Sequence, residues 1–310
     1  MACPDAATCL LSLAFLFGTV KSMKSTSSRR FFIKQATLGT LACGVLGACS
    51  PILSASEPVD KKISFKFLNQ IKRGTESYTQ GLVYELDREL NKPVLFESGG
   101  RYGRSLLRCV DAETLEVIRQ VKIPNAYFAE GIATIGDKLY MLTWQEHACL
   151  VYDKTTFKQV DEFRYRGEGW GLAYDGKFLA MSDGSSKIRF MDPKDFRQKR
   201  SIDVHFTTKS GVRKSVALLN ELEYVNGELW ANVFQQKYVV RINPDNGQII
   251  GTALNFSNLV PENLRTSPDY VLNGLAFDSK GQRLYITGKC WPVMYVFAVT
   301  STEDADSSDM

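Results

Sequence analysis

From residue 63 onward, hydrophobic residues occur in short runs that are separated by turn dipeptides such as Asp-Gly, Asn-Gly, Gly-Asp and Asp-Pro. The runs are rich in β-branched and aromatic residues, which favour strands over helices. No stretch of convincing length has the spacing of three and four residues that predicts an amphipathic helix. The pattern therefore predicts an all-β fold.

The predicted strands recur in a fixed order. Five copies each begin with a polar or Trp residue before a strand, 40 to 53 residues apart: Gln80, Glu130, Trp170, Asn220 and Asn273. Second strands are predicted over 94–97, 139–142, 178–181, 229–232 and 284–287. Third strands are predicted over 107–111, 150–153, 188–192, 239–243 and 294–299. A period of about 40–50 residues is typical of a β-propeller, so five copies predict five blades.

The two ends of the repeat predict how the ring closes. The last copy stops after its third strand, and an additional strand is predicted over 64–71, before the first copy. We expect this N-terminal strand to complete the last blade, because that arrangement closes the ring and leaves no open edge. A β-sandwich with coincidental spacing is the alternative, and five copies in phase favour the propeller.

The residues that start the first strands should meet in space. First strands line the central channel of a propeller, so these five residues are expected around one of its mouths. All four tryptophans also fall at repeat positions: Trp144, Trp170, Trp230 and Trp291. Tryptophans beside polar groups are typical of a small-ligand pocket. Core tryptophans would give the same pattern, and the residues alone leave both interpretations open.

The net charge of +4 comes entirely from the first 49 residues, which carry five basic residues and one acidic residue. The rest of the chain is neutral, which argues against nucleic-acid binding. The two histidines, His147 and His205, are too few and too far apart for a His-rich metal centre.

The first 49 residues have the features of an export signal. Arg29-Arg30 forms a twin-arginine pattern before an uncharged stretch, 35–48, that is too short to span a bilayer. Cys49 follows Leu-Gly-Ala, as in the lipobox of bacterial lipoproteins, where the Cys thiol is diacylated. We expect a lipid anchor at Cys49 and a location on the periplasmic side of a bacterial membrane. An uncleaved signal anchor is the alternative.

The remaining boundaries follow from composition. Residues 50–62 are predicted as a linker, 63–300 as the propeller and 301–310 as a disordered acidic tail. Met23 is a more ordinary start than Met1, because the apolar run 9–20 lacks a basic region before it. With Cys49 lipidated, Cys109, Cys149 and Cys290 allow at most one disulfide.

Nine motifs, taken in order, resemble those of the plant-type glutaminyl-peptide cyclotransferases. They are Tyr78–Leu82, Phe128–Ile132, Leu142–Trp144, Glu168–Leu172, Ser182–Ser185, Leu219–Tyr224, Leu229–Val233, Leu272–Phe277 and Gly288–Pro292. The resemblance, together with the export signal, implies a bacterial member of that family. The resemblance covers residues 65–299 and implies a five-bladed propeller, unrelated to the zinc-dependent animal-type enzymes. Tyr78 stands where Phe is common, and Ala129 separates Phe128 from Glu130. Neither departure removes a polar group.

The resemblance implies that an N-terminal glutamine of a peptide or protein is converted to pyroglutamate with release of ammonia. No metal or cofactor is required, although a structural cation in the channel would be compatible. Glu130 matches the catalytic glutamate of Phe-x-Glu-Gly and is expected to carry the proton from amine to leaving nitrogen. Lys289 would stabilise oxyanion charge or pair with Glu130. The alternative for Glu130 is a residue that caps a strand.

The expected substrate-binding residues are Gln80, Phe128, Trp144, Trp170, Asn220, Trp230 and Trp291. The amides would bind the carboxamide, and the aromatic rings would fold the glutamine side chain and exclude water. The protein is expected to be a monomer. Two other classes of function remain: a non-catalytic propeller lipoprotein that binds peptides or acts as a scaffold, and a calcium-dependent lactonase-like enzyme. The mouth offers one carboxylate, which is poor for a dication.

Overall fold

The computed structural model describes residues 62–301. The predicted export segment, the lipobox at Cys49 and most of the acidic tail lie outside these residues. Within the described part, no helix is long and apolar enough to cross a membrane. Cys109, Cys149 and Cys290 are free thiols, so the described residues contain no disulfide.

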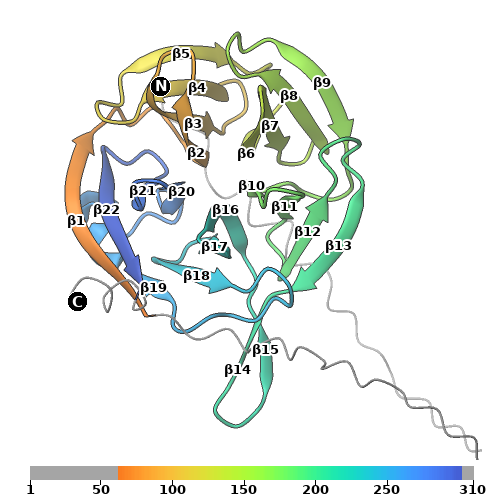
Figure 1. Cartoon of the computed structure of the whole chain (residues 1–310), viewed down its shortest axis with the longest axis vertical. Coiled ribbons are helices and arrows are strands. Elements are labelled where there is room, and N and C mark those ends of the chain that lie inside the picture. Colours follow the sequence, from red (N-terminus) through yellow and green to blue (C-terminus); the bar gives the residue numbers. More distant parts are fainter. Residues whose placement is uncertain (1–61, 302–310) are drawn as a thin grey trace, which may run out of the picture. The chain divides into compact units, whose positions relative to one another are not determined.

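Within residues 62–301, twenty strands form five four-stranded antiparallel sheets arranged in a ring (Figure 1). Blade 1 comprises β2 (Thr79–Asp87), β3 (Lys92–Gly99), β4 (Leu106–Asp111) and β5 (Val117–Lys122). Blade 2 comprises β6 (Ala129–Ile135), β7 (Lys138–Thr143), β8 (Ala148–Asp153) and β9 (Gln159–Arg164). Blade 3 comprises β10 (Leu172–Tyr174), β11 (Leu179–Ser182), β12 (Lys187–Met191) and β13 (Gln198–Asp203). The prediction of an all-β, five-bladed propeller is confirmed.

Blade 4 comprises β16 (Leu219–Val225), β17 (Glu228–Val233), β18 (Tyr238–Ile242) and β19 (Leu254–Asn255). Blade 5 comprises β20 (Leu272–Asp278), β21 (Arg283–Gly288), β22 (Val293–Ser301) and β1 (Ile63–Lys72). Between blades 3 and 4, β14 (His205–Thr207) and β15 (Arg213–Ser215) form a hairpin that projects from the ring (Figure 1). Two short 3₁₀ turns, η2 (Ser257–Leu259) and η3 (Glu262–Leu264), precede β20.

The N-terminal strand closes the ring as predicted. β1 pairs antiparallel with β22, from Ile63 opposite Ser301 to Lys72 opposite Val293. The Phe65 ring packs edge-on against Trp230 and Phe256. The first and last strands of the domain are therefore joined within one sheet, and this pairing covers the edge of β22.

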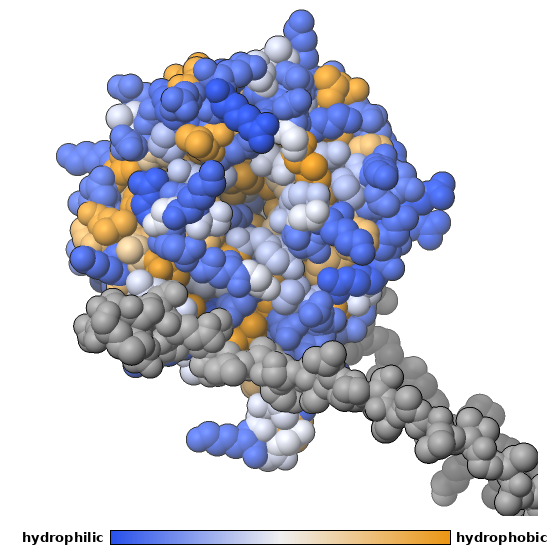
Figure 2. Space-filling model, viewed as in Figure 1, coloured by the Kyte–Doolittle hydropathy of each residue, from blue (hydrophilic) through white to orange (hydrophobic). Residues whose placement is uncertain are grey.

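The hydrophobic core lies between neighbouring blades. One cluster joins Phe96 and Leu107 of blade 1 to Ile132 and Leu139 of blade 2, and equivalent clusters join the other pairs. The inner three strands are mostly buried, whereas the outer strands β5, β9 and β13 are largely exposed. Figure 2 shows hydrophilic side chains over most of the rim. Burial of the sheet faces thus holds the blades together.

The first strands share a local irregularity at the mouth of the channel. In β2, β6, β16 and β20 the ladder shifts register at the same point, where one extra residue is inserted. Such bulges redirect side chains and are common beside active sites. The inserted positions include Gln80, Glu130, Asn220 and Asn273. Next to Glu130, a Cβ on Gly131 would lie 2.5 Å from the backbone nitrogen of Leu172, so only glycine permits this approach.

Candidate active site

Three of the predicted mouth residues form one hydrogen-bonded chain. Nε2 of Gln80 donates to Oε1 of Glu130 at 3.2 Å. Nδ2 of Asn273 donates to the Thr79 carbonyl at 3.0 Å and to Oε1 of Gln80 at 3.4 Å. Glu130 is only 5% exposed, and burial raises the pKa of its carboxyl well above the usual value. The floor of the site is therefore a buried carboxyl with a raised pKa, hydrogen-bonded to the Gln80 amide, which Asn273 holds in turn.

Trp170 and Asn220 complete the predicted set at the mouth. The Trp170 carbonyl accepts a hydrogen bond from the Gly131 amide at 2.6 Å, and the Asn220 carbonyl accepts one from Oγ of Ser182 at 2.7 Å. Oδ1 of Asn220 and Oδ1 of Asn273 are buried and have no hydrogen-bond partner among residues 62–301. A buried acceptor without a donor is costly, so these two oxygens are suited to a ligand that brings N–H groups.

Seven side chains from all five blades form a closed wall around this floor, each touching the next: Tyr78, Phe128, Trp144, Glu168, Trp170, Phe234 and Lys289. The Phe128 ring lies edge-on to Tyr78 and Trp144, with centroid distances of 6.3 and 5.6 Å. The Trp170 ring lies edge-on to Phe234 at 5.7 Å. The wall therefore brings together residues far apart in the sequence.

Glu168 joins the two tryptophans of the wall. Its Oε2 accepts hydrogen bonds from Nε1 of Trp144 at 2.7 Å and from Nε1 of Trp170 at 2.9 Å. Its Oε1 accepts one from Nε2 of Gln145 at 3.2 Å. One carboxylate thus fixes two indoles from different blades. Sequence reasoning missed this role, although Glu168 stands two residues before Trp170 in a quoted motif.

Lys289 of blade 5 closes the wall between Phe234 of blade 4 and Tyr78 of blade 1. Its Nζ lies 4.8 Å from the Tyr78 ring centroid and 5.0 Å from that of Phe234. Burial lowers the pKa of Lys289 to about 8, while the nearby Glu130 carboxylate acts to raise it. In turn, the Lys289 charge limits the rise in the pKa of Glu130. Phe234, which the sequence did not single out, contributes one of the two rings that hold this ammonium.

The loop before β2 is fixed by Glu97, a buried carboxylate of β3. Its Oε1 accepts hydrogen bonds from Arg73, Ser77 and Thr79, and its Oε2 accepts one from Nε of Arg108 at 2.8 Å. The two guanidiniums hold the pKa of Glu97 at about 2 despite its burial. Because Ser77 and Thr79 flank Tyr78 and precede Gln80, this cluster positions both site residues.

Comparison with known proteins identifies the family. The family model for glutamine cyclotransferase matches residues 40–299. The chain belongs to the glutamine cyclotransferase family. It is 40% identical over 293 residues to glutaminyl-peptide cyclotransferase of Arabidopsis thaliana, covering 89% of this chain and 88% of that one. The crystal structure of Myxococcus xanthus glutaminyl cyclase matches with a TM-score of 0.68 and 31% identity, over 79% of this chain and all of that one. The family recognised from the motifs is confirmed.

The cyclotransferase structure corrects the expected positions of two tryptophans. Trp230 lies wholly buried between blades 4 and 5, where its Nε1 donates to Glu228 at 3.0 Å. Trp291 is also wholly buried, and its Nε1 donates to the Tyr270 carbonyl at 2.9 Å. Neither side chain is exposed at the mouth, because Trp230 packs into the inter-blade core and Trp291 packs behind Gly288. A Cβ on Gly288 would lie 2.2 Å from the Trp291 ring.

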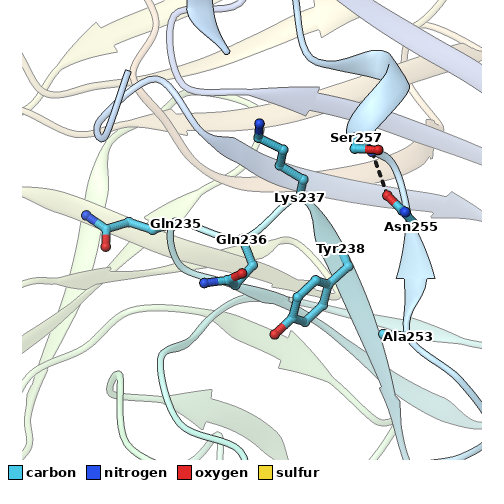
Figure 3. A pocket seen from close by; sticks show the side chains of 7 residues that line it. All are labelled: Gln235, Gln236, Lys237, Tyr238, Ala253, Asn255 and Ser257. Atoms are coloured by element: carbon cyan, nitrogen blue, oxygen red, sulfur yellow. Dashed lines mark hydrogen bonds between the residues drawn. The ribbon is translucent and has the colours of Figure 1, made fainter. Parts of the chain in front are cut away.

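A cavity of about 450 Å³ lies on blade 4 of the cyclotransferase domain (Figure 3). It is lined by Gln235, Gln236, Lys237, Tyr238, Ala253, Asn255 and Ser257. These residues include no carboxyl and none of the wall or floor residues, so the cavity lacks the groups that the chemistry needs. Among residues 62–301, no three His, Cys, Asp or Glu side chains are grouped to hold a metal ion.

Proposed function

We propose that this glutaminyl-peptide cyclotransferase uses Glu130 as the proton shuttle when it converts an N-terminal glutamine to pyroglutamate and ammonia. The observation that carries the proposal is the Glu130 carboxyl, buried inside the aromatic wall with a raised pKa and one amide donor. An α-ammonium has a pKa of about 8, so raising the pKa of Glu130 from its ordinary value reduces the cost of passing a proton between the two groups.

The reaction needs one proton to be moved and no external nucleophile. The α-amine attacks the γ-carboxamide carbon, a C–N bond forms, and the carbonyl oxygen gains negative charge. The bond to the amide nitrogen then breaks, and ammonia leaves. Glu130 gives its proton to the leaving nitrogen and receives the one that the attacking nitrogen loses. Lys289 supplies positive charge for the oxyanion.

Gln80, Asn220 and Asn273 are proposed to bind the carboxamide. The unpaired oxygens of Asn220 and Asn273 can accept its N–H groups, and these neutral side chains suit a neutral amide. Phe128, Trp144 and Trp170 would fold the glutamine side chain over Glu130 and exclude water. Exclusion matters because hydrolysis of the carboxamide would give glutamate instead of the lactam.

The deciding experiment incubates the purified protein with a dipeptide that begins with glutamine. We expect ammonia and a pyroglutamyl product in equal amounts, with activity that persists in EDTA. Binding of the dipeptide without product would favour a non-catalytic peptide-binding propeller. Loss of activity in EDTA that zinc restores would contradict a carboxyl shuttle that works without metal.

We further propose that the protein is exported to the periplasmic side of a bacterial membrane and anchored there by lipid at Cys49, and that it is a monomer. The support is the twin-arginine pattern and the lipobox in the sequence. Cys49→Ala should move the protein from the membrane fraction to the soluble fraction, and Arg29→Lys with Arg30→Lys should block export. Normal export of the double variant would replace this route with the general secretory one.

A further inference from the structure

Arg101 occupies the edge of the site wall without belonging to its floor. It follows β3, and its Cζ lies 4.6 Å from the Tyr78 ring centroid and 5.8 Å from that of Tyr270. Its side chain also makes a hydrogen bond with Tyr270. Because Lys289 contacts the same Tyr78 ring, two cations lie on one side of the mouth.

The backbone holds Arg101 firmly in this place. Oγ of Ser105 accepts a hydrogen bond from the Arg101 amide at 3.1 Å and another from the Ala129 amide at 3.1 Å, next to Glu130. The preceding Gly100 donates to the Tyr78 carbonyl at 2.9 Å. A Cβ on Gly100 would lie 2.2 Å from the Phe128 ring, so this close passage requires glycine. The φ of Arg101 is 154°, in a region that residues other than glycine rarely adopt.

Within residues 62–301, the Arg101 guanidinium makes no ion pair with a carboxylate, and its neighbours are Tyr78, Tyr270 and Cys290. Asp269 lies close enough to raise the pKa of Tyr78 but makes no ion pair with Arg101. Buried guanidiniums such as Arg73 and Arg108 share Glu97 instead. Arg101 is partly exposed, so a preorganised cation at the mouth keeps N–H donors available to a ligand.

We propose that Arg101 binds a carboxylate on the residue that follows the N-terminal glutamine, and that it makes the enzyme prefer substrates with negative charge there. This inference rests on the proposed function, because a glutamine side chain held above Glu130 sends the rest of the peptide out through the mouth. The carboxylate can be the terminal group of a dipeptide or an acidic side chain of a longer substrate. A guanidinium binds either through charge-assisted hydrogen bonds.

The test compares kcat/KM for matched substrates. Glutaminyl-alanine is compared with its amide, and glutaminyl-glutamate amide with glutaminyl-glutamine amide, so the two sources of carboxylate are measured separately. The wild type should prefer at least one charged member by about 5- to 10-fold, since the contact is partly exposed. Arg101→Gln should bring that ratio close to one. Arg104→Gln removes an exposed charge from the same loop and should leave it unchanged.

The proposal is overturned if Arg101→Gln keeps the wild-type ratios, if the wild type shows no charge preference, or if Arg104→Gln lowers them equally. Failure of the proposed function is distinguishable, since the wild type would then release no ammonia from any of the four peptides. In that case the same peptides are titrated calorimetrically into Glu130→Gln with and without Arg101→Gln. A tighter Kd for the charged member that depends on Arg101 supports the subsite, and equal Kd values overturn it.

Discussion

Two buried carboxyls in neighbouring blades show how side-chain partners decide what a residue can do. Glu97 lies between the guanidiniums of Arg73 and Arg108, and its pKa falls to about 2. Glu130 is equally buried but receives one neutral amide donor, and its pKa rises. Glu97 therefore stays ionised and holds the loop, whereas the raised pKa of Glu130 makes its carboxyl a better proton carrier.

Glu168 gives a prediction at the scale of the residue. Glu168→Ala removes the shared acceptor of two indoles, so KM should rise by about 10-fold as the wall loosens. The Glu168 charge also raises the pKa of Glu130, so its loss should lower that pKa. The alkaline limb of the rate profile, where Glu130 loses the proton that it gives to the leaving nitrogen, should then move to lower pH. Steady-state kinetics across pH measure both effects.

The matched control is Glu162→Ala, a carboxyl outside the site that pairs with Arg164. Glu168→Gln keeps one acceptor oxygen, so its KM should lie between those of the wild type and Glu168→Ala. Its pH–rate profile should still shift, because the charge is removed. An unchanged KM in Glu168→Ala would contradict the role of Glu168 in fixing Trp144 and Trp170. An unchanged alkaline limb would contradict its effect on the pKa of Glu130.

The phase of the repeat predicted which residues start each first strand, and the structure places those residues together. The phase of the repeat did not predict where the side chains of Trp230 and Trp291 lie. A position along a strand does not say whether a side chain points into the channel mouth or into the inter-blade core. Phe234 and Glu168 were missed for a related reason. Their roles arise from contacts between blades, which have no pattern within one repeat.

At the scale of the element, β16 carries a carboxylate that joins three blades. Oε2 of Glu221 accepts a hydrogen bond from the backbone amide of Leu275 in blade 5 at 3.0 Å. The same carboxyl also accepts one from the backbone amide of Leu82 in blade 1. Glu221 is 1% exposed, and burial together with the nearby Glu223 raises its pKa well above the usual value. The bulge in β16 aims this side chain into the channel.

Glu221 makes stability depend on pH. Its pKa is higher in the folded than in the unfolded protein, so its contribution is complete below the unfolded value and is lost as pH rises toward the folded value. Between those values the free energy of unfolding should fall by about 1.4 kcal/mol per pH unit from this group alone. Glu221→Gln keeps an acceptor and removes the titration.

Urea unfolding at a series of pH values between about 5 and 9 gives the free energy of unfolding of the wild type and of Glu221→Gln. The experiment compares how steeply that free energy falls with pH in the two proteins. The variant should lose less stability than the wild type as pH rises, with the largest difference at the alkaline end. Parallel curves for the two proteins would mean that Glu221 does not carry the proton into the folded state.

Sequence patterns located the inner strands because their hydrophobic runs are continuous. The outer strands β5, β9, β13 and β19 were not located, since they are short or exposed and carry a weak pattern. The hairpin β14–β15 was missed for the same reason: it pairs only with itself and is largely exposed.

At the scale of the whole molecule, closure of the ring determines whether the site exists. Tyr78 and Lys289 belong to the first and last blades, which β1 links through its pairing with β22. A chain that begins at Arg73 lacks β1 but keeps the Arg73–Glu97 pair. Its free energy of unfolding should be lower by about 3 kcal/mol or more, because the burial of the Phe65 side chain and its neighbours is lost. The Tm should fall by roughly 10 °C. A chain that begins at Lys62 is the control.

Calorimetry of the two shortened chains gives the comparison. Addition of a synthetic peptide with the sequence of residues 62–72 should restore part of the Tm of the chain that begins at Arg73, because the peptide can pair with the open edge of β22. Equal Tm values for the two chains without peptide would show that β1 does not hold the ring closed.

The most direct test of the proposed chemistry is to measure kcat of Glu130→Gln and of the wild type with a dipeptide that begins with glutamine. Ammonia release is the readout, and it is measured across a range of pH. Glutamine keeps the shape and a hydrogen-bonding group but cannot carry the proton, so kcat should fall by about 10²–10⁴-fold with little change in KM. The wild-type rate should rise toward weakly alkaline pH as the substrate α-amine, of pKa about 8, loses its proton. A Glu130→Gln variant that keeps nearly full kcat would contradict the shuttle and leave Glu130 as a residue that caps β6.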